Sequence, residues 1–453
     1  MRLTALFPIV LVLASAAAPA QTVAFRDVTV IPMDSERRLE SHTVIVREDT
    51  IAELGPSDLV PIPRGARVIE GEGRFLMPGL AEMHAHVPPL ARSQDVERAL
   101  DLFLVNGVTT LRGVLGEPGH LSLRAQLASG RRNGPRLYTS GPSFNGNSVT
   151  GAGQAIEMVG RQKRDGYDLL KLHPGLEADE FDAIVSRARA VGIPVTGHVP
   201  DSVPLEHALA AGLGCIEHMD GYVRALLPPE DPARSRDPGF FGLDVVAQAQ
   251  RERIHALVEA TRKAGAAVTP TETLMVNLLG GIAMEELLQR DEMAYVPAPT
   301  LAQWKRSRES MQARTDAADA SRFLQLRREL LLALHRGGVP VLLGSDAPQV
   351  FNVPGFSTHR ELALMVEAGL SPYEALRTGT VASAEHLGVG DRRGKVAAGH
   401  EADLVLLEAD PLTDIGHARR IVGVMVAGRW HARSDLDARL ARIRGEVAAS
   451  DGP

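Results

Sequence analysis

The sequence is poor in several residue types, and each shortage excludes a class of protein. Its 453 residues include one cysteine, Cys215, so the chain can form neither an intrachain disulfide nor a metal cage of thiolates. Lysine and arginine number 49 against 56 acidic residues, a net charge of -7, and no basic block could follow a phosphate backbone. We therefore expect no nucleic-acid partner, and any metal site must use histidine, carboxylate or modified lysine side chains.

Long apolar runs are also scarce. After Arg2, an apolar run extends from Leu3 to Leu13, and small residues lead to Ala18-Pro19-Ala20. This pattern predicts a secretory signal peptide at residues 1–20, with a buried N-terminal helix as the alternative. The run is too short to span a bilayer comfortably and no later run exceeds it, so we expect no membrane anchor after signal removal. The protein is thus expected to be exported, either periplasmic or extracellular.

Hydrophobic residues make up 44% of the chain and charged residues 23%, which excludes disordered, collagenous and coiled-coil proteins. Short segments rich in Val, Ile and Thr at both ends of the chain read as antiparallel strands. We expect the two ends to pair into one small β-sandwich, built from residues 21–76 and 398–435, with 436–453 as a C-terminal tail. The expected strands include residues 22–30, 43–46, 66–69, 403–407 and 421–426.

Between these ends, strand-like apolar runs alternate with amphipathic helical stretches over residues 77–397. Repeated βα units of this length predict an α/β fold with a (β/α)8 TIM-type barrel. A doubly wound open sheet is the competing architecture, although no glycine-rich phosphate fingerprint follows the first strand. Two polar, proline-containing stretches, 224–242 and 284–322, are too long for simple connections, and we expect both to overhang the mouth of the barrel.

Candidate metal ligands stand at the ends of the predicted strands. His84 and His86 lie two residues apart on one strand, where alternation puts both imidazoles on the same face. His198, His218 and Asp346 each follow a later apolar run, at the point where a barrel strand should open into its loop. Imidazole and carboxylate ligands suit Zn²⁺ best and also accept Mn, Co or Fe, so these positions predict a site for divalent metal.

Lys171 ends the strand-like run Asp168-Leu169-Leu170, where packing would favour an apolar residue. A buried ammonium beside cations is disfavoured. Reaction of the neutral amine with carbon dioxide would instead give a carbamate, whose two oxygens can bridge two metals. The alternative is a lysine whose amine reaches solvent from the strand end.

Taken together, these motifs resemble the amidohydrolase superfamily, and more narrowly its imidazolonepropionase-related and prolidase-like exported members. The resemblance rests on Pro78-Gly79-Leu80 through His84-Ala85-His86, on Lys171, His198, His218 and Gly344-Ser345-Asp346, and on the segments 379–384 and 394–405. It implies two divalent metals at the strand ends, with His84, His86 and Asp346 on one, His198 and His218 on the other, and carbamylated Lys171 as the bridge. Imidazolonepropionase itself is usually mononuclear and lacks this lysine, so we do not expect the chain to be that enzyme.

Such a site predicts hydrolysis. Two cations that share a water would lower its pKa toward neutrality, and Asp346 could carry the released proton to the departing nitrogen. Tyr222 and Arg224, just beyond His218, are candidates for binding the substrate carbonyl or a substrate carboxylate, and His173 for touching substrate or ordering the carbamate.

We therefore expect a binuclear hydrolase that cleaves an amide-type carbon–nitrogen bond in a small peptide or N-acyl amino acid, in the manner of an Xaa-Pro dipeptidase. A lactone, ester or phosphotriester hydrolase on the same metals is the alternative enzyme. A metal-dependent binding protein without turnover is the alternative from another class. Metal identity and oligomeric state stay open, and a homo-oligomer is compatible with the family resemblance.

Overall fold

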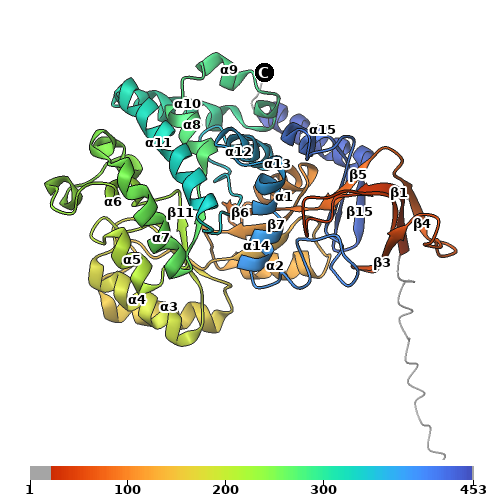
Figure 1. Cartoon of the computed structure of the whole chain (residues 1–453), viewed down its shortest axis with the longest axis horizontal. Helices are drawn as coiled ribbons and strands as arrows, with labels where there is room; N and C mark the ends of the chain where they lie inside the picture. The colour runs from red at the N-terminus through yellow and green to blue at the C-terminus, as the bar shows by residue number, and fades with distance from the viewer. Residues whose placement is uncertain (1–21, 451–453) are drawn as a thin grey trace, which may run out of the picture.

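The computed structural model describes residues 22–450, so the predicted signal peptide at residues 1–20 lies outside the described residues. Strands from both ends of the chain form one eight-stranded sheet, in the order β15-β14-β13-β5-β1-β2-β3 with β4 beside β1. Figure 1 shows these strands together at one end of the molecule, away from the helices of the central region. The strands are β1 (Thr22–Val30), β2 (Leu39–Arg47), β3 (Thr50–Pro56), β4 (Arg67–Glu70), β5 (Phe75–Pro78), β13 (Leu404–Leu407), β14 (Ile421–Val426) and β15 (Arg429–Ala432).

The expected pairing of the two chain ends is present, but their strands form one continuous sheet, so the expected β-sandwich is not confirmed. The reason is β5, which pairs with β1 on one side and with β13 on the other, and so joins the N-terminal strands to the C-terminal ones. The sheet is strongly curled, because the rings of Phe25 in β1 and Trp430 in β15 lie 5.2 Å apart although three strands separate them in the sheet order.

Seven short parallel strands form the central region in two sheets, β6-β7-β8 and β9-β10-β11-β12. The ladder is not continuous, but isolated bridges span the gaps: Ser140 pairs with Leu169, Val268 with Val341, and Ala347 with Ala85. Residues 341–347 thus lie between β12 and β6, in the place of an eighth strand. The seven strands are β6 (Leu80–Ala85), β7 (Val108–Gly113), β8 (Arg136–Thr139), β9 (Leu170–Leu172), β10 (Val195–Gly197), β11 (Cys215–Glu217) and β12 (Ala267–Thr269).

Helices follow these strands along the chain and pack around them, which buries apolar side chains on both sides of each strand. The helices are α1 (Ser93–Val105), α2 (Gly119–Ala128), α3 (Ala152–Asp165), α4 (Ala178–Val191), α5 (Leu205–Ala211), α7 (Ile254–Ala264), α8 (Glu272–Leu279), α11 (Ala317–Arg336), α12 (Phe356–Glu367), α13 (Pro372–Thr378) and α14 (Val381–His386).

The two long stretches after β11 and β12 contain further helices. After β11 these are α6 (Tyr222–Ala225) and the 3-10 helices η1 (Pro232–Ser235), η2 (Phe240–Gln248) and η3 (Arg251–Arg253); after β12 they are α9 (Met284–Leu288), η4 (Asp291–Tyr295) and α10 (Ala298–Ala313). A further 3-10 helix, η5 (Ile415–Arg419), lies between β13 and β14.

The C-terminal segment expected to be a tail forms helix α15 (Arg433–Ser450) instead. Its Leu436, Ile443 and Val447 are buried at helical spacing, and its Arg442 pairs with Asp101 of α1 at 2.6 Å. The helix therefore fastens the end of the chain to the central region. Among the described residues, no helix is long and apolar enough to cross a membrane.

Candidate functional site

Two histidines of β6 meet an aspartate from the segment that takes the place of the eighth strand. Nε2 of His86 lies 2.7 Å from an Oδ atom of Asp346, and Nε2 of His84 lies 3.5 Å from the same oxygen. The backbone of the two segments fixes this meeting, because Asp346 N donates to the carbonyl of His84 at 3.0 Å. Ligand atoms of the three residues lie within 4.8 Å of one another, which is close enough to hold one metal ion.

His198 and His218 stand beside this group, after β10 and β11. The His218 ring lies 4.5 Å from the His84 ring and 4.8 Å from the His198 ring, measured between centroids. In each of these three imidazoles, Nδ1 forms a hydrogen bond with a side chain that is not one of the clustered rings. Histidines that bind metal usually have such a partner on the second ring nitrogen. The partners are Glu217 for His84 at 2.6 Å, Asp220 for His198 at 3.1 Å and Thr271 for His218 at 2.8 Å. Nε2 of each ring therefore stays available for a metal.

Lys171 is a buried polar group of this site whose hydrogen-bonding capacity is not satisfied. The side chain is fully buried, and Nζ has no hydrogen-bond partner. Burial lowers the pKa of the amine below its ordinary value, against the attraction of Glu217 and Asp346. A buried amine without partners among imidazoles and a carboxylate fits a site completed by metal cations and an anion on the lysine nitrogen. The donor set therefore fits the divalent metals expected from the sequence.

A buried ion pair, Arg112–Glu217, contacts His84 on the Nδ1 side of its ring. Glu217, at the end of β11, accepts from His84 Nδ1, from Arg112 Nη2 at 2.8 Å and from Thr196 Oγ1. Arg112 also donates to the carbonyl of Met83 at 2.6 Å, next to His84 in the chain. Burial alone would raise the pKa of Glu217, but Arg112 and His84 hold it well below its usual range. The carboxylate is therefore charged, and it fixes the orientation of the His84 ring.

A second buried arginine fixes the backbone at His218. Arg327 of α11 donates to the carbonyl of His218 and to that of Pro270, both at 2.7 Å, and its charge is balanced by Glu272 at 2.6 Å. His218 has a φ of 61°, and Thr271 a φ of 54°, in the left-handed region that costs energy for non-glycine residues. The Arg327 contacts hold both turns in place, so His218 and its Thr271 partner face the site together.

Both long insertions reach the site, as the sequence predicts. The Phe241 ring, from the stretch after β11, lies 5.0 Å from the His218 ring and stacks at 5.8 Å on His198. From the stretch after β12, Tyr295 and Trp304 help to line a hollow of about 420 Å³ that also includes His86. These aromatic side chains shape the space above the polar cluster.

Tyr222 and Arg224 do not reach the site, which corrects the expectation that they bind substrate. The Tyr222 hydroxyl is fully buried and bonds to Thr261 Oγ1 at 2.9 Å, on the side of helix α7. Arg224 donates to the carbonyls of Asp201 and Val203 at 2.7 and 2.8 Å. Both residues lie close to His218 in sequence. Helix α6 begins at Tyr222, however, and directs the two side chains toward Thr261 and toward the carbonyls of Asp201 and Val203. His173 does lie near the site: its ring is 5.4 Å from that of His198.

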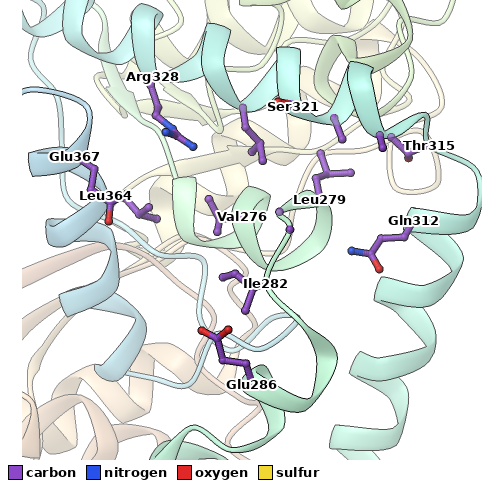
Figure 2. A pocket seen from close by; sticks show the side chains of 15 residues that line it. Val276, Leu279, Ile282, Glu286, Gln312, Thr315, Ser321, Arg328, Leu364 and Glu367 are labelled. Carbon is purple, nitrogen blue, oxygen red and sulfur yellow. The ribbon is translucent and has the colours of Figure 1, made fainter.

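A larger hollow lies elsewhere in the molecule. Figure 2 shows its lining from α8, α10, α11 and α12, including Val276, Gln312, Arg328 and Glu367, around a volume of about 860 Å³. None of the histidines or predicted ligands belongs to this lining. The predicted ligand His86 lines the smaller hollow instead.

The sequence matches the amidohydrolase family over residues 75–431, which covers the barrel strands and every predicted metal ligand. The chain belongs to the amidohydrolase family. Imidazolonepropionase from Salmonella agona is 24% identical over 420 residues, which cover 88% of this chain and 94% of that protein. Membership identifies the chain as a hydrolase that acts on carbon–nitrogen bonds, in a family that is typically metal-dependent.

Solved structures of the family superpose on most of the chain. A bottromycin amidohydrolase shares 25% identity with a TM-score of 0.72, covering 94% of this chain and 90% of that one. An Xaa-Pro dipeptidase with bound methionine shares 18% identity with a TM-score of 0.67, covering 91% of this chain and all of that one. These structures support a TIM-barrel-type fold, and the match to the family over residues 75–431 confirms the amidohydrolase superfamily predicted from the sequence motifs.

Proposed function

We propose that the protein is a binuclear metal-dependent hydrolase of small peptides or N-acyl amino acids, with Xaa-Pro dipeptides as the first substrates to test. The observation that carries this proposal is Lys171, a fully buried amine without a hydrogen-bond partner beside five candidate ligands. A carbamate forms when neutral Nζ bonds to the carbon of carbon dioxide and releases a proton. Its two oxygens suit a bridge between two divalent ions, of which Zn²⁺ fits the donor set best.

When bound, such metals supply a nucleophile from water at neutral pH and polarise the substrate carbonyl. The residues of the chain do the remaining work. His84, His86 and Asp346 would hold one metal, and His198 and His218 would hold the other. One Asp346 oxygen faces the two β6 histidines, whereas the other lies 3.9 Å from His218. Asp346 can therefore keep its position through one oxygen and move a proton from water to the leaving nitrogen with the other.

A dipeptide fits this site better than a large substrate does. The hollow beside His86 has a volume of about 420 Å³, in the range of small-molecule pockets. Its walls are largely apolar. The Phe241 ring packs against His198 and His218. The similarity to an Xaa-Pro dipeptidase structure supports the same substrate class, whereas the similarity to imidazolonepropionase supports a cyclic amide as the second candidate.

The test is a hydrolysis screen on purified protein of known metal content. It compares Xaa-Pro and other dipeptides, N-acyl amino acids, imidazolonepropionate, lactones and a phosphotriester. We expect turnover of substrates with an amide beside a free carboxylate. Turnover confined to imidazolonepropionate, to lactones or to the phosphotriester would refute the peptidase proposal, and tight metal binding without any turnover would favour a binding protein.

Export is part of the same proposal, and it rests on the sequence of residues 1–20 alone. Cells that produce the full chain should yield a protein that begins at Gln21 outside the cytoplasm, as read by N-terminal sequencing of the fractions. A cytoplasmic protein that retains Met1 or Arg2 would contradict export.

A further inference from the structure

The hollow beside His86 contains a basic group that the site described so far does not use. Its walls come from helix α1, from the insertion that contains Tyr295 and Trp304, and from the segment around Val353. Most of this lining is apolar, but Arg92, Asp95 and Arg98 of the α1 region also belong to it. A small pocket of this kind binds an apolar ligand through its walls and orients that ligand through its few charged groups.

Arg98 has hydrogen-bond donors that have no partner among the described residues. Its side chain is 13% exposed, and its Nε is buried without a hydrogen-bond partner. Among the described residues, its carboxylate partner is Asp95, which lies 3.4 Å from Nη1, a long contact for an ion pair. A guanidinium carries five N–H donors in a planar fork, so most of the binding capacity of Arg98 is unused within the described residues.

The neighbouring arginines are engaged differently. The side chain of Arg92 is 66% exposed and lies 2.6 Å from Asp95. The single negative charge of Asp95 therefore faces two arginines. Arg224, the carboxylate binder expected from the sequence, spends two of its donors on backbone carbonyls. Because this wall contains two arginines and one aspartate, its net charge is positive. It lies beside His86, a candidate metal ligand.

We propose that Arg98 binds the free carboxylate of the substrate and so determines specificity for peptides or N-acyl amino acids with an unblocked C-terminus. The apolar walls then take the side chain of the C-terminal residue, and the scissile amide lies toward His86. This inference rests on the proposed function, because it assigns the carboxylate of that substrate class to a residue. Arg98 would be a substrate-binding residue, whereas Asp95 would limit its affinity by competing for the same donors.

The test compares an Xaa-Pro dipeptide with its C-terminal amide. We expect the wild-type protein to prefer the acid, and Arg98→Gln to lower kcat/KM for the acid by about 100-fold while it changes kcat/KM for the amide by less than about threefold. Arg98→Lys, which keeps the charge but loses the fork, should recover part of the preference. Arg224→Gln is the matched control, since it removes a buried arginine outside the hollow and should leave the ratio of acid to amide unchanged.

Asp95→Asn is the complementary variant, and it serves if Arg98→Gln does not fold. It removes the competing carboxylate and should raise the preference for the acid. Equal losses on acid and amide in Arg98→Gln, or an unchanged preference in Asp95→Asn, would overturn the assignment.

A binding measurement separates this inference from the proposed function. Calorimetric titration of metal-depleted protein with the intact dipeptide and with its amide needs no turnover. If the protein hydrolyses no dipeptide but Arg98→Gln selectively loses binding of the acid, the proposed function fails and the role of Arg98 stands. If acid and amide bind equally to the wild-type protein, the role of Arg98 is refuted.

Discussion

Glu217 offers a direct test of the buried scaffold behind the site. The substitution Glu217→Gln keeps the shape of the side chain but removes its charge. The guanidinium of Arg112, which is 2% exposed, then has no counter-charge at 2.8 Å. Breaking a buried ion pair by neutralising one partner costs about 3–5 kcal/mol, because the remaining charge is still out of water. At about 1.4 kcal/mol per tenfold change, the unfolding equilibrium constant should rise by roughly 100-fold to 4000-fold.

The pair Arg26–Glu70 is the matched control. Its nitrogen–oxygen distance is 2.6 Å, but both side chains are more than half exposed. Glu70→Gln should therefore cost no more than about 1 kcal/mol, as solvent-exposed ion pairs usually do. Arg112→Met together with Glu217→Gln should cost less than the sum of the two single changes, since the double variant leaves no unpaired charge.

The assay is denaturant unfolding of metal-depleted protein, followed by circular dichroism and by fluorescence, so that the contribution of bound metal is removed. Metal affinity is measured separately. Glu217→Gln should also weaken metal binding by about 10-fold to 100-fold, because residues that orient a metal ligand have effects of this size. If Glu217→Gln costs as little as Glu70→Gln and binds metal normally, the proposed role of the Arg112–Glu217 pair is wrong.

Three further outcomes follow from the same structure. Asp346→Asn should keep most of the bound metal but lower turnover by at least about 100-fold, as measured by elemental analysis beside steady-state kinetics, and an active variant would exclude Asp346 as the proton carrier. Removal of metal by a chelator should abolish turnover and lower the Tm, and activity that survives verified metal loss would contradict a metal site. Burial raises the pKa of Glu361 from 4.5 to about 8, so its folded form holds a proton that the unfolded form loses. The free energy of unfolding should therefore fall as pH rises from about 4.5 to about 8 and level off above. Glu361→Gln should flatten this part of a plot of unfolding free energy against pH. If the variant and the wild-type protein gave identical plots, the pKa of Glu361 would not be raised.

Local patterns were enough to predict the residues that gather at the site. His84 and His86 stand out by their spacing on one strand, and Lys171, His198, His218 and Asp346 by their positions after apolar runs. In a ring of parallel strands these positions meet at one end, so the topology brings them together even though more than 250 residues separate the first from the last.

The supporting contacts could not be predicted in this way. Glu217 and Arg112 are 105 residues apart, and Arg327 reaches His218 from 109 residues away, so only the folded chain pairs them. Tyr222 and Arg224 show the opposite error, in which closeness in sequence to His218 suggested a role that helix α6 prevents.

At the C-terminus, the spacing of Leu436, Ile443 and Val447 does carry the signal of a helix with one apolar face, and the expectation of a tail overlooked it. The curled single sheet depends on β5, a strand of four residues at the domain boundary. Its two partners are strands from opposite ends of the chain, which no local pattern reveals.

The bridged binuclear site is tested most directly by the metal content of the wild-type protein and of Lys171→Ala, measured per chain by elemental analysis together with turnover of an Xaa-Pro dipeptide. A bridged binuclear site predicts about two metals per wild-type chain, and at most one metal with turnover lost in Lys171→Ala. One metal per chain in both proteins, with turnover unchanged by the substitution, would exclude a site bridged by Lys171.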